Sequence, residues 1–211
     1  MSQIERLLER AKGSGFLGSG PIEVHIRHAK GFLVALGQRR FDTLLDLGAG
    51  GGVPGLLLAA MMPEVRVLLL DASQRRTAFL GDAVHSLGFG ERVTVLRERA
   101  ERAGRLPELR ETMDVVVARS FGCPATTAEC GSPLVVVGGT MVVSEPPAVA
   151  GPVPRRSATV RWPPAELELL DLVPAAPVVG EGFSFQILEK TGKIGDRYPR
   201  RSGLPGQRPL F

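Results

Sequence analysis

The stretch Asp46-Leu-Gly-Ala-Gly-Gly-Gly-Val-Pro-Gly55 decides the fold of this chain. It lies between an apolar run at 43–47, where we expect a buried strand, and another at 54–62, where we expect a helix. Glycines lack a Cβ atom, so the backbone can turn sharply there and approach a ligand closely. Pro54 suits the first turn of a helix, where its missing N–H is not needed. The stretch therefore predicts a strand, a tight glycine loop and a helix in succession.

The same alternation of strands and helices continues on both sides of the loop. We expect helices at 2–12, 22–36 and 74–87, strands at 65–70, 92–96, 113–118 and 141–143, and a helix end at 134–137. This order is typical of an α/β fold with a mainly parallel sheet. The runs 167–173 and 183–188 predict a terminal antiparallel hairpin.

The length of 211 residues favours one domain, because single hydrophobic cores stop growing near ~250 residues. We assign residues 1–189 to this domain. The proline-rich stretch 145–165 predicts a long surface loop. Residues 190–211 predict an irregular basic tail, in which six Lys and Arg residues accompany one Asp. Such a tail is either a solvated terminus or a contact for RNA phosphates.

The composition excludes several classes of protein. The formal net charge of +4 is mild, so it permits an anionic partner without requiring one. The two cysteines, Cys123 and Cys130, are too few for a disulfide framework or a zinc site, and we expect both to be small buried residues. No apolar run approaches the ~20 residues of a membrane span, and the N-terminus lacks a signal core. We expect a cytoplasmic protein without a metal ion.

Two acids distinguish between possible cofactors. Asp71 ends the second strand, where a ribose diol would lie within its reach. Gly50, Gly52 and Gly55 also match the G-x-G-x-x-G pattern of NAD-binding proteins. A dinucleotide, however, would bring its pyrophosphate close to Asp46, which would repel it. S-adenosylmethionine carries an ammonium and a sulfonium instead, so this cofactor is favoured over a nicotinamide. The predicted site comprises Asp46, Gly48, Gly50, Gly52 and Asp71.

Four further motifs make the chain similar to a known family. They are LLLDASQRRTAFL (68–80), RAE (99–101), VVVARSF (115–121) and YPRRSGLP (198–205). Together with the glycine loop they resemble the RsmG family, also called glucose-inhibited division protein B, over about residues 22–144 and 183–210. The resemblance implies a Rossmann-like class I methyltransferase that uses S-adenosylmethionine to methylate N7 of a guanine in 16S ribosomal RNA. The small ribosomal subunit would be its partner, and we expect a monomer.

The resemblance also implies which residues contact the cofactor. Carried over position by position, the family's contacts fall on Gly48, Val53, Ala100, Glu101 and Arg119. The first two belong to the loop under the methionine end, and the next two would border the adenine. Arg119 is the candidate catalytic residue at the mouth of the site, where it would orient the base or support the methionine carboxylate. Guanine N7 already carries a lone pair, so no general base is required.

The chain departs from the family pattern at two places. It has Ser144-Glu145 where the family tends to have a basic residue at the end of the fifth strand. About 20 residues precede Pro21, whereas the family usually has an additional helical segment before this point. Two alternatives therefore stay open, a methyltransferase of another RNA or a small molecule, and a non-catalytic RNA-binding paralogue. Arg27-His28 resembles the family's RH element, and here we expect a structural histidine.

Overall fold

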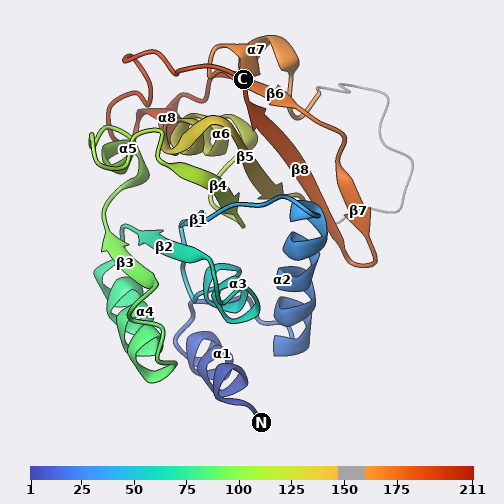
Figure 1. Cartoon of the computed structure of the whole chain (residues 1–211), viewed down its shortest axis with the longest axis vertical. Helices are drawn as coiled ribbons and strands as arrows, with labels where there is room; N and C mark the ends of the chain where they lie inside the picture. Colours follow the sequence, from blue (N-terminus) through green and yellow to red (C-terminus); the bar gives the residue numbers. More distant parts are fainter. Residues whose placement is uncertain (147–159) are drawn as a thin grey trace.

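Eight strands form one sheet in the computed structural model, which describes residues 1–146 and 160–211. The strand order is β3-β2-β1-β4-β5-β8-β6, with β7 paired to β8 (Figure 1). The strands from β3 to β5 are parallel, and β8 runs antiparallel to its three neighbours. The strand bounds are β1 Thr43–Leu47, β2 Arg66–Asp71, β3 Val93–Arg97, β4 Met113–Ala118, β5 Val135–Ser144, β6 Leu172–Pro174, β7 Val178–Gly180 and β8 Phe183–Lys190.

Helices cover both faces of this sheet, because successive strand residues point to opposite sides. Leu44 belongs to a core with α1–α4, whereas Leu45 belongs to a second core with α5–α7. Figure 1 shows the two groups of helices on either side of the strands. The helix bounds are α1 Gln3–Gly13, α2 Ile22–Leu36, α3 Gly55–Met61, α4 Gln74–Ser86, α5 Ala100–Ala103, α6 Pro124–Gly131, α7 Pro164–Glu168 and α8 Leu204–Gln207.

The strand register places the candidate residues at one edge of the sheet. Leu47, the last residue of β1, pairs with Leu70 of β2 and with Ala118 of β4. The residues that follow these three, Gly48, Asp71 and Arg119, therefore emerge side by side. This edge is formed by the carboxyl ends of the parallel strands, where open α/β sheets bind their ligands.

The predicted α/β fold with a mainly parallel sheet is confirmed, and two local predictions are wrong. Residues 134–137 are not a helix end, because β5 begins at Val135 and continues to Ser144 through a register shift against β4. The strand expected at 167–173 begins only at Leu172, since its first residues belong to α7. β8 pairs with β6 and β7, so the antiparallel end of the sheet is present with one strand more than expected.

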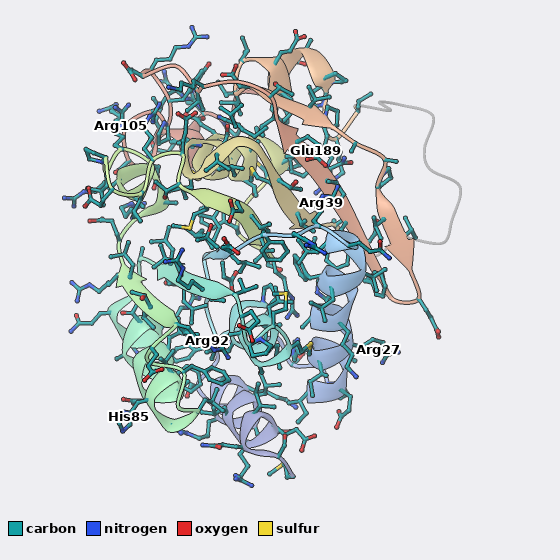
Figure 2. All side chains as sticks on the ribbon, in the orientation of Figure 1. Arg27, Arg39, His85, Arg92, Arg105 and Glu189 are labelled. Carbon is teal, nitrogen blue, oxygen red and sulfur yellow. The ribbon has the colours of Figure 1, made fainter. Side chains whose placement is uncertain are left out.

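The tail at 190–211 packs against the α5–α6 side of the sheet (Figure 1). Ile194, Tyr198 and Pro205 are buried. Arg110 donates hydrogen bonds to the carbonyls of Ile194 and Tyr198, and Arg105 (labelled in Figure 2) lies beside the tail and donates to that of Pro199. The tail thus differs from the solvated segment that its composition suggests.

Most of the predicted proline-rich loop lies outside the described residues, at 147–159. Its flanks are described. Glu145 accepts a hydrogen bond of 2.8 Å from the indole of Trp162 and pairs with Arg161. The acid at the end of β5 therefore holds the two flanks together. Within the described residues, no helix is long and apolar enough to cross a membrane.

Candidate cofactor site

Two adjoining cavities open at the carboxyl edge of the sheet. The larger cavity, of about 510 Å³, lies beyond β2 and β3, and the smaller cavity, of about 190 Å³, lies between the glycine loop and residues 16–18. Gly48, Arg76 and Ser120 line both. The two cavities therefore meet at the start of the glycine loop, and we treat them as one site.

The first glycine of the loop is required by both conformation and space. Gly48 has φ +75°, in the left-handed region that side chains disfavour. A Cβ atom on Gly48 would also come within 2.7 Å of the Phe121 ring. Gly50, with φ +54°, lines the smaller cavity, as does Val53. These three predicted residues therefore shape the junction and the floor of the site.

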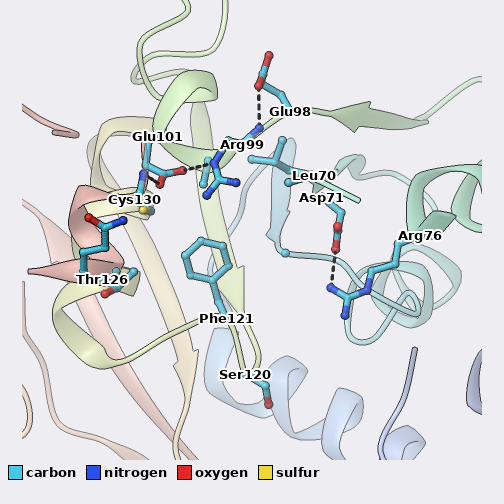
Figure 3. Close-up of a pocket in the computed structure, with 16 residues that line it drawn as sticks. Leu70, Asp71, Arg76, Glu98, Arg99, Glu101, Ser120, Phe121, Thr126 and Cys130 are labelled. Atoms are coloured by element: carbon cyan, nitrogen blue, oxygen red, sulfur yellow. Dashed lines mark hydrogen bonds and ion pairs between the residues drawn. The ribbon is translucent and has the colours of Figure 1, made fainter. Parts of the chain in front are cut away.

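Asp71 connects the glycine loop to the second strand. Its side chain is buried, and it lines the larger cavity. One carboxylate oxygen accepts a 2.9 Å hydrogen bond from the Gly50 N–H, and the other accepts one of 2.8 Å from the Ser73 N–H. Arg76 faces the carboxylate at 3.6 Å (Figure 3). The acid expected at the ribose thus also fixes the loop.

Two predicted residues lie beneath the site instead of on its surface. Within the described part of the chain, Asp46 and Gly52 line neither cavity. Asp46 is buried and accepts a 2.8 Å hydrogen bond from the Gly55 N–H. Burial raises its pKa to about 7, against the lowering effects of that bond and of Arg119. A Cβ atom on Gly52 would collide with Leu56, so this glycine serves the loop's own packing.

Arg119 lies in the smaller cavity and is held by a histidine. Its Nη2 donates to Nδ1 of His25 at 2.7 Å, and Nε2 of His25 lies 3.3 Å from the carbonyl oxygen of Gly18. Burial, followed by the charge of Arg119, lowers the pKa of His25, which favours the neutral ring needed to accept the Arg119 bond. The buried Nη1 of Arg119 has no hydrogen-bond partner among the described residues. Other parts of the Arg119 residue line the smaller cavity.

The predicted adenine residues lie at the far end of the larger cavity. Ala100 and Glu101 begin α5, directly after β3, and both line this cavity. Glu101 accepts a 2.7 Å hydrogen bond from the Gly203 N–H and lies 3.9 Å from Arg99 (Figure 3). Of the nine predicted site residues, the structure brings seven to the two cavities: Gly48, Gly50, Val53, Asp71, Ala100, Glu101 and Arg119.

Several lining residues escaped the sequence analysis. Phe16, Leu17 and Gly18 line the smaller cavity, but their Gly- and Ser-rich setting has the composition of a linker. Ser120 and Phe121 follow Arg119 within a motif that was recognised, so position could have found them. The tail contributes three more residues to the larger cavity. Gly203 belongs to the recognised motif at 198–205, whereas no signal in the sequence pointed to Gly206 and Gln207.

His28 and the two cysteines are not among the predicted site residues. His28 stacks against Phe32 and Phe185, and burial lowers its pKa to about 4. Cys130 is buried as predicted, and burial raises the pKa of its thiol. Cys123 is exposed, so the prediction for that residue is wrong. Its place at the N-cap of α6, before Pro124, leaves it at the surface.

Comparison with known proteins decides which family has this site. Residues 24–145 match the model of the GidB family, described as rRNA small subunit methyltransferase G. The chain belongs to this family. A relative from Thermotoga neapolitana, named ribosomal RNA small subunit methyltransferase G, is 35% identical over 80% of this chain and 72% of its own length. Another of that name, from Pelotomaculum thermopropionicum, is 31% identical over 97% of this chain and 86% of its own length.

Solved structures agree with the GidB assignment at the level of the fold. A SAM-dependent methyltransferase from Aquifex aeolicus has a TM-score of 0.58 at 17% identity, covering 85% of this chain and 96% of that one. A geranyl diphosphate methyltransferase in complex with SAM has a TM-score of 0.57 at 17% identity, covering 79% and 85%. The predicted family and the Rossmann-like methyltransferase fold are thus confirmed, and the GidB family is one of S-adenosylmethionine-dependent methyltransferases.

Proposed function

We propose that this chain transfers a methyl group from S-adenosylmethionine to N7 of a guanine in 16S ribosomal RNA. Membership of the GidB family carries the proposal, because the relatives are named as methyltransferases of the small ribosomal subunit. We further propose that it acts in the cytoplasm, as a monomer. The cofactor has an adenosine end and a methionine end, and the two adjoining cavities differ in ways that suit these ends.

The larger cavity suits the adenosine end. The carboxylate of Asp71 would accept hydrogen bonds from the ribose hydroxyls, because each oxygen of an ionised acid can accept a second bond beside the one that it takes from the backbone. Ala100 and Glu101 would border the adenine. The two lie beyond β3, one strand farther from the glycine loop, so the nucleoside would extend away from the loop along the sheet edge.

The smaller cavity suits the methionine end. Gly50 and Val53 provide its floor, and the free Nη1 of Arg119 is a charged donor without a partner among the described residues. A buried donor in this state costs free energy until it meets an acceptor. The methionine carboxylate and the O6 and N7 atoms of guanine are acceptors of the required kind.

The protein contributes to the reaction mainly by positioning the two reactants. Bound S-adenosylmethionine supplies an electrophilic methyl group, and guanine N7 supplies the electron pair. The protein must then hold the two in line at about 3–3.5 Å and exclude water. Arg119 is the catalytic candidate because it emerges from a fixed strand end and is oriented by His25.

Cations near the site support an RNA substrate. Arg76 and Arg99 line the larger cavity with half-exposed side chains. Two of the six tail cations, Lys190 and Arg200, are committed to internal partners. The other four are exposed and would contact RNA phosphates: Lys193, Arg197, Arg201 and Arg208.

Transfer of labelled methyl groups to isolated small ribosomal subunits tests the proposal, with Arg119→Ala as the informative variant. If Arg119 acts in the transfer itself, the rate at saturation falls while RNA affinity is kept. If it mainly holds the methionine carboxylate, cofactor affinity falls and the saturated rate is kept. Arg40→Ala, an exposed arginine at the opposite edge of the sheet, is the matched control. A wild-type protein that binds the cofactor and labels no ribosomal substrate contradicts the proposal.

A further inference from the structure

The C-terminal segment contributes a wall to the larger cavity. Gly203, Gly206 and Gln207 line it, together with Ala100 and Glu101 of α5. These tail residues are about a hundred positions from α5 in the sequence, yet Gly203 and Glu101 share a 2.7 Å hydrogen bond. Figure 1 shows α8 beside α5 and α6. The proposed adenine end of the site therefore lies between α5 and the tail.

An ion pair with a buried carboxylate anchors this segment. Glu129 of α6 is fully buried, and Arg200 reaches it through three donors. The backbone N–H and Nε of Arg200 donate to one carboxylate oxygen at 2.8 Å each, and Nη2 donates to the other at 2.6 Å. Charged groups with two aligned hydrogen bonds hold a fixed geometry. The anchor thus fixes the chain three residues before Gly203.

Further bonds hold the segment beyond the anchor. The hydroxyl of Thr126 donates to the carbonyl of Pro205 at 2.9 Å, and Thr126 itself lines the larger cavity. Nη2 of Arg200 also donates to the carbonyl of Arg208 at 2.7 Å. The first turn of α8 is therefore tied to Thr126 of the cavity lining, and its C-terminal end is tied to Arg200 of the anchor, so the segment has the order that a binding surface needs.

We infer that residues 200–208 form the adenosine-binding wall of the cofactor site, with Arg200 and Glu129 as positioning residues. This inference rests on the proposed function, because it takes S-adenosylmethionine as the ligand of the larger cavity. The exposed cations Arg201 and Arg208 belong to the same segment. A contact of these cations with RNA would therefore act on the wall of the cofactor site directly.

Gly206 offers a test that spares the fold. A Cβ atom at Gly206 would meet no atom within 4 Å, and the residue lines the larger cavity. Gly206→Leu therefore adds bulk to open space within the proposed adenosine site. Gly81 of α4 is an exposed helical glycine that also has no atom within 4 Å of a built Cβ, so Gly81→Leu is the matched control.

Calorimetric titration with two ligands distinguishes the nucleoside end of the site from the amino-acid end. S-adenosylhomocysteine has both ends, whereas 5′-methylthioadenosine lacks the amino acid. We expect Gly206→Leu to weaken both ligands at least about tenfold, and Arg119→Ala to leave the affinity for 5′-methylthioadenosine unchanged. Gly81→Leu should bind both as the wild type does.

The outcomes distinguish this inference from the proposed function. Wild-type affinity for both ligands in Gly206→Leu overturns the inference while the proposed function stands. A loss for S-adenosylhomocysteine alone overturns it as well, because the segment would then not contact the nucleoside. A wild-type protein that binds neither ligand contradicts the proposed function itself. Unchanged thermal unfolding of unliganded Gly206→Leu shows that the loss of affinity is local.

Discussion

Replacement of Asp71 by alanine should affect both the cofactor and the glycine loop. The proposed ribose contact is lost, and so are the hydrogen bonds from the N–H groups of Gly50 and Ser73. Each hydrogen bond to a charged acceptor contributes about 1.5–3 kcal/mol. Loss of the ribose contact alone should weaken S-adenosylhomocysteine by about 10- to 150-fold, at 1.4 kcal/mol per factor of ten.

The same substitution should lower stability. It leaves the Gly50 N–H without its acceptor in a part-buried position, at a cost of about 1–3 kcal/mol. For a chain of this size that corresponds to a fall of about 2–12 °C in Tm. The loop that Asp71 fixes is the loop under the cofactor, so part of the lost affinity will come from loosening of that loop.

Calorimetric titration with S-adenosylhomocysteine at 25 °C measures the affinity, and thermal unfolding without ligand measures the stability. Asp82→Ala is the control, because Asp82 is an exposed carboxylate on α4, the helix that follows Asp71. It should change neither quantity. A folded Asp71→Ala protein with wild-type affinity refutes the ribose assignment.

Three further predictions concern stability and RNA binding. Because the pKa of His28 is lowered to about 4, the unfolded chain binds more protons between pH 6.5 and 4, and stability is lost as pH falls through that window. The full pKa shift corresponds to about 3 kcal/mol of unfolding free energy, and partial exposure of the ring reduces this to about 1–2 kcal/mol. Urea unfolding at pH 7 and pH 5 measures the loss, which should be smaller in His28→Gln. Gly55→Ala places a Cβ atom within 2.6 Å of the Asp46 carboxylate and should lower the free energy of unfolding by about 1–3 kcal/mol. Gly81→Ala, the control, should be neutral or stabilising by up to about 1 kcal/mol. Equal melting temperatures of the two variants would contradict the packing argument. Neutralising the four exposed tail cations should lower RNA affinity and keep cofactor affinity; they are Lys193, Arg197, Arg201 and Arg208. The slope of log affinity against log salt concentration should fall by about 0.7 for each lost contact to single-stranded RNA. An unchanged slope would remove the tail from the RNA interface.

The parts of the site that depend on local sequence could be predicted. The glycine loop, the strand before it and the helix after it are encoded within the twenty residues 43–62, so spacing alone indicated Gly48 and Gly50. Asp71 and Arg119 follow short apolar strands, and parallel strands bring their carboxyl ends to one edge. Their place at this edge therefore followed from their position after a parallel strand, whereas the choice of Arg119 came from the family resemblance.

The parts that depend on contacts between distant residues could not be predicted. Arg200 and Glu129 are charged, and charged residues are usually exposed to solvent, yet Glu129 is fully buried and its ion pair with the partly exposed Arg200 fixes the tail. The N-terminal segment 16–18 has the composition of a linker, and its role as a lining follows only from its packing over the glycine loop. The Asp46 carboxylate was expected to face the ligand, whereas its bond to the Gly55 N–H turns it under the loop.

The central claim is that this chain methylates guanine N7 in 16S ribosomal RNA. Its most direct test combines purified protein, S-adenosylmethionine with a labelled methyl group and isolated small ribosomal subunits that lack the modification. The RNA is then extracted and cleaved chemically at N7-methylguanine, and the cleavage position is read by primer extension. We expect one labelled guanine in 16S RNA and a much lower rate for Arg119→Ala. Label on another atom or another RNA, or none at all from a protein that binds the cofactor, would contradict the account.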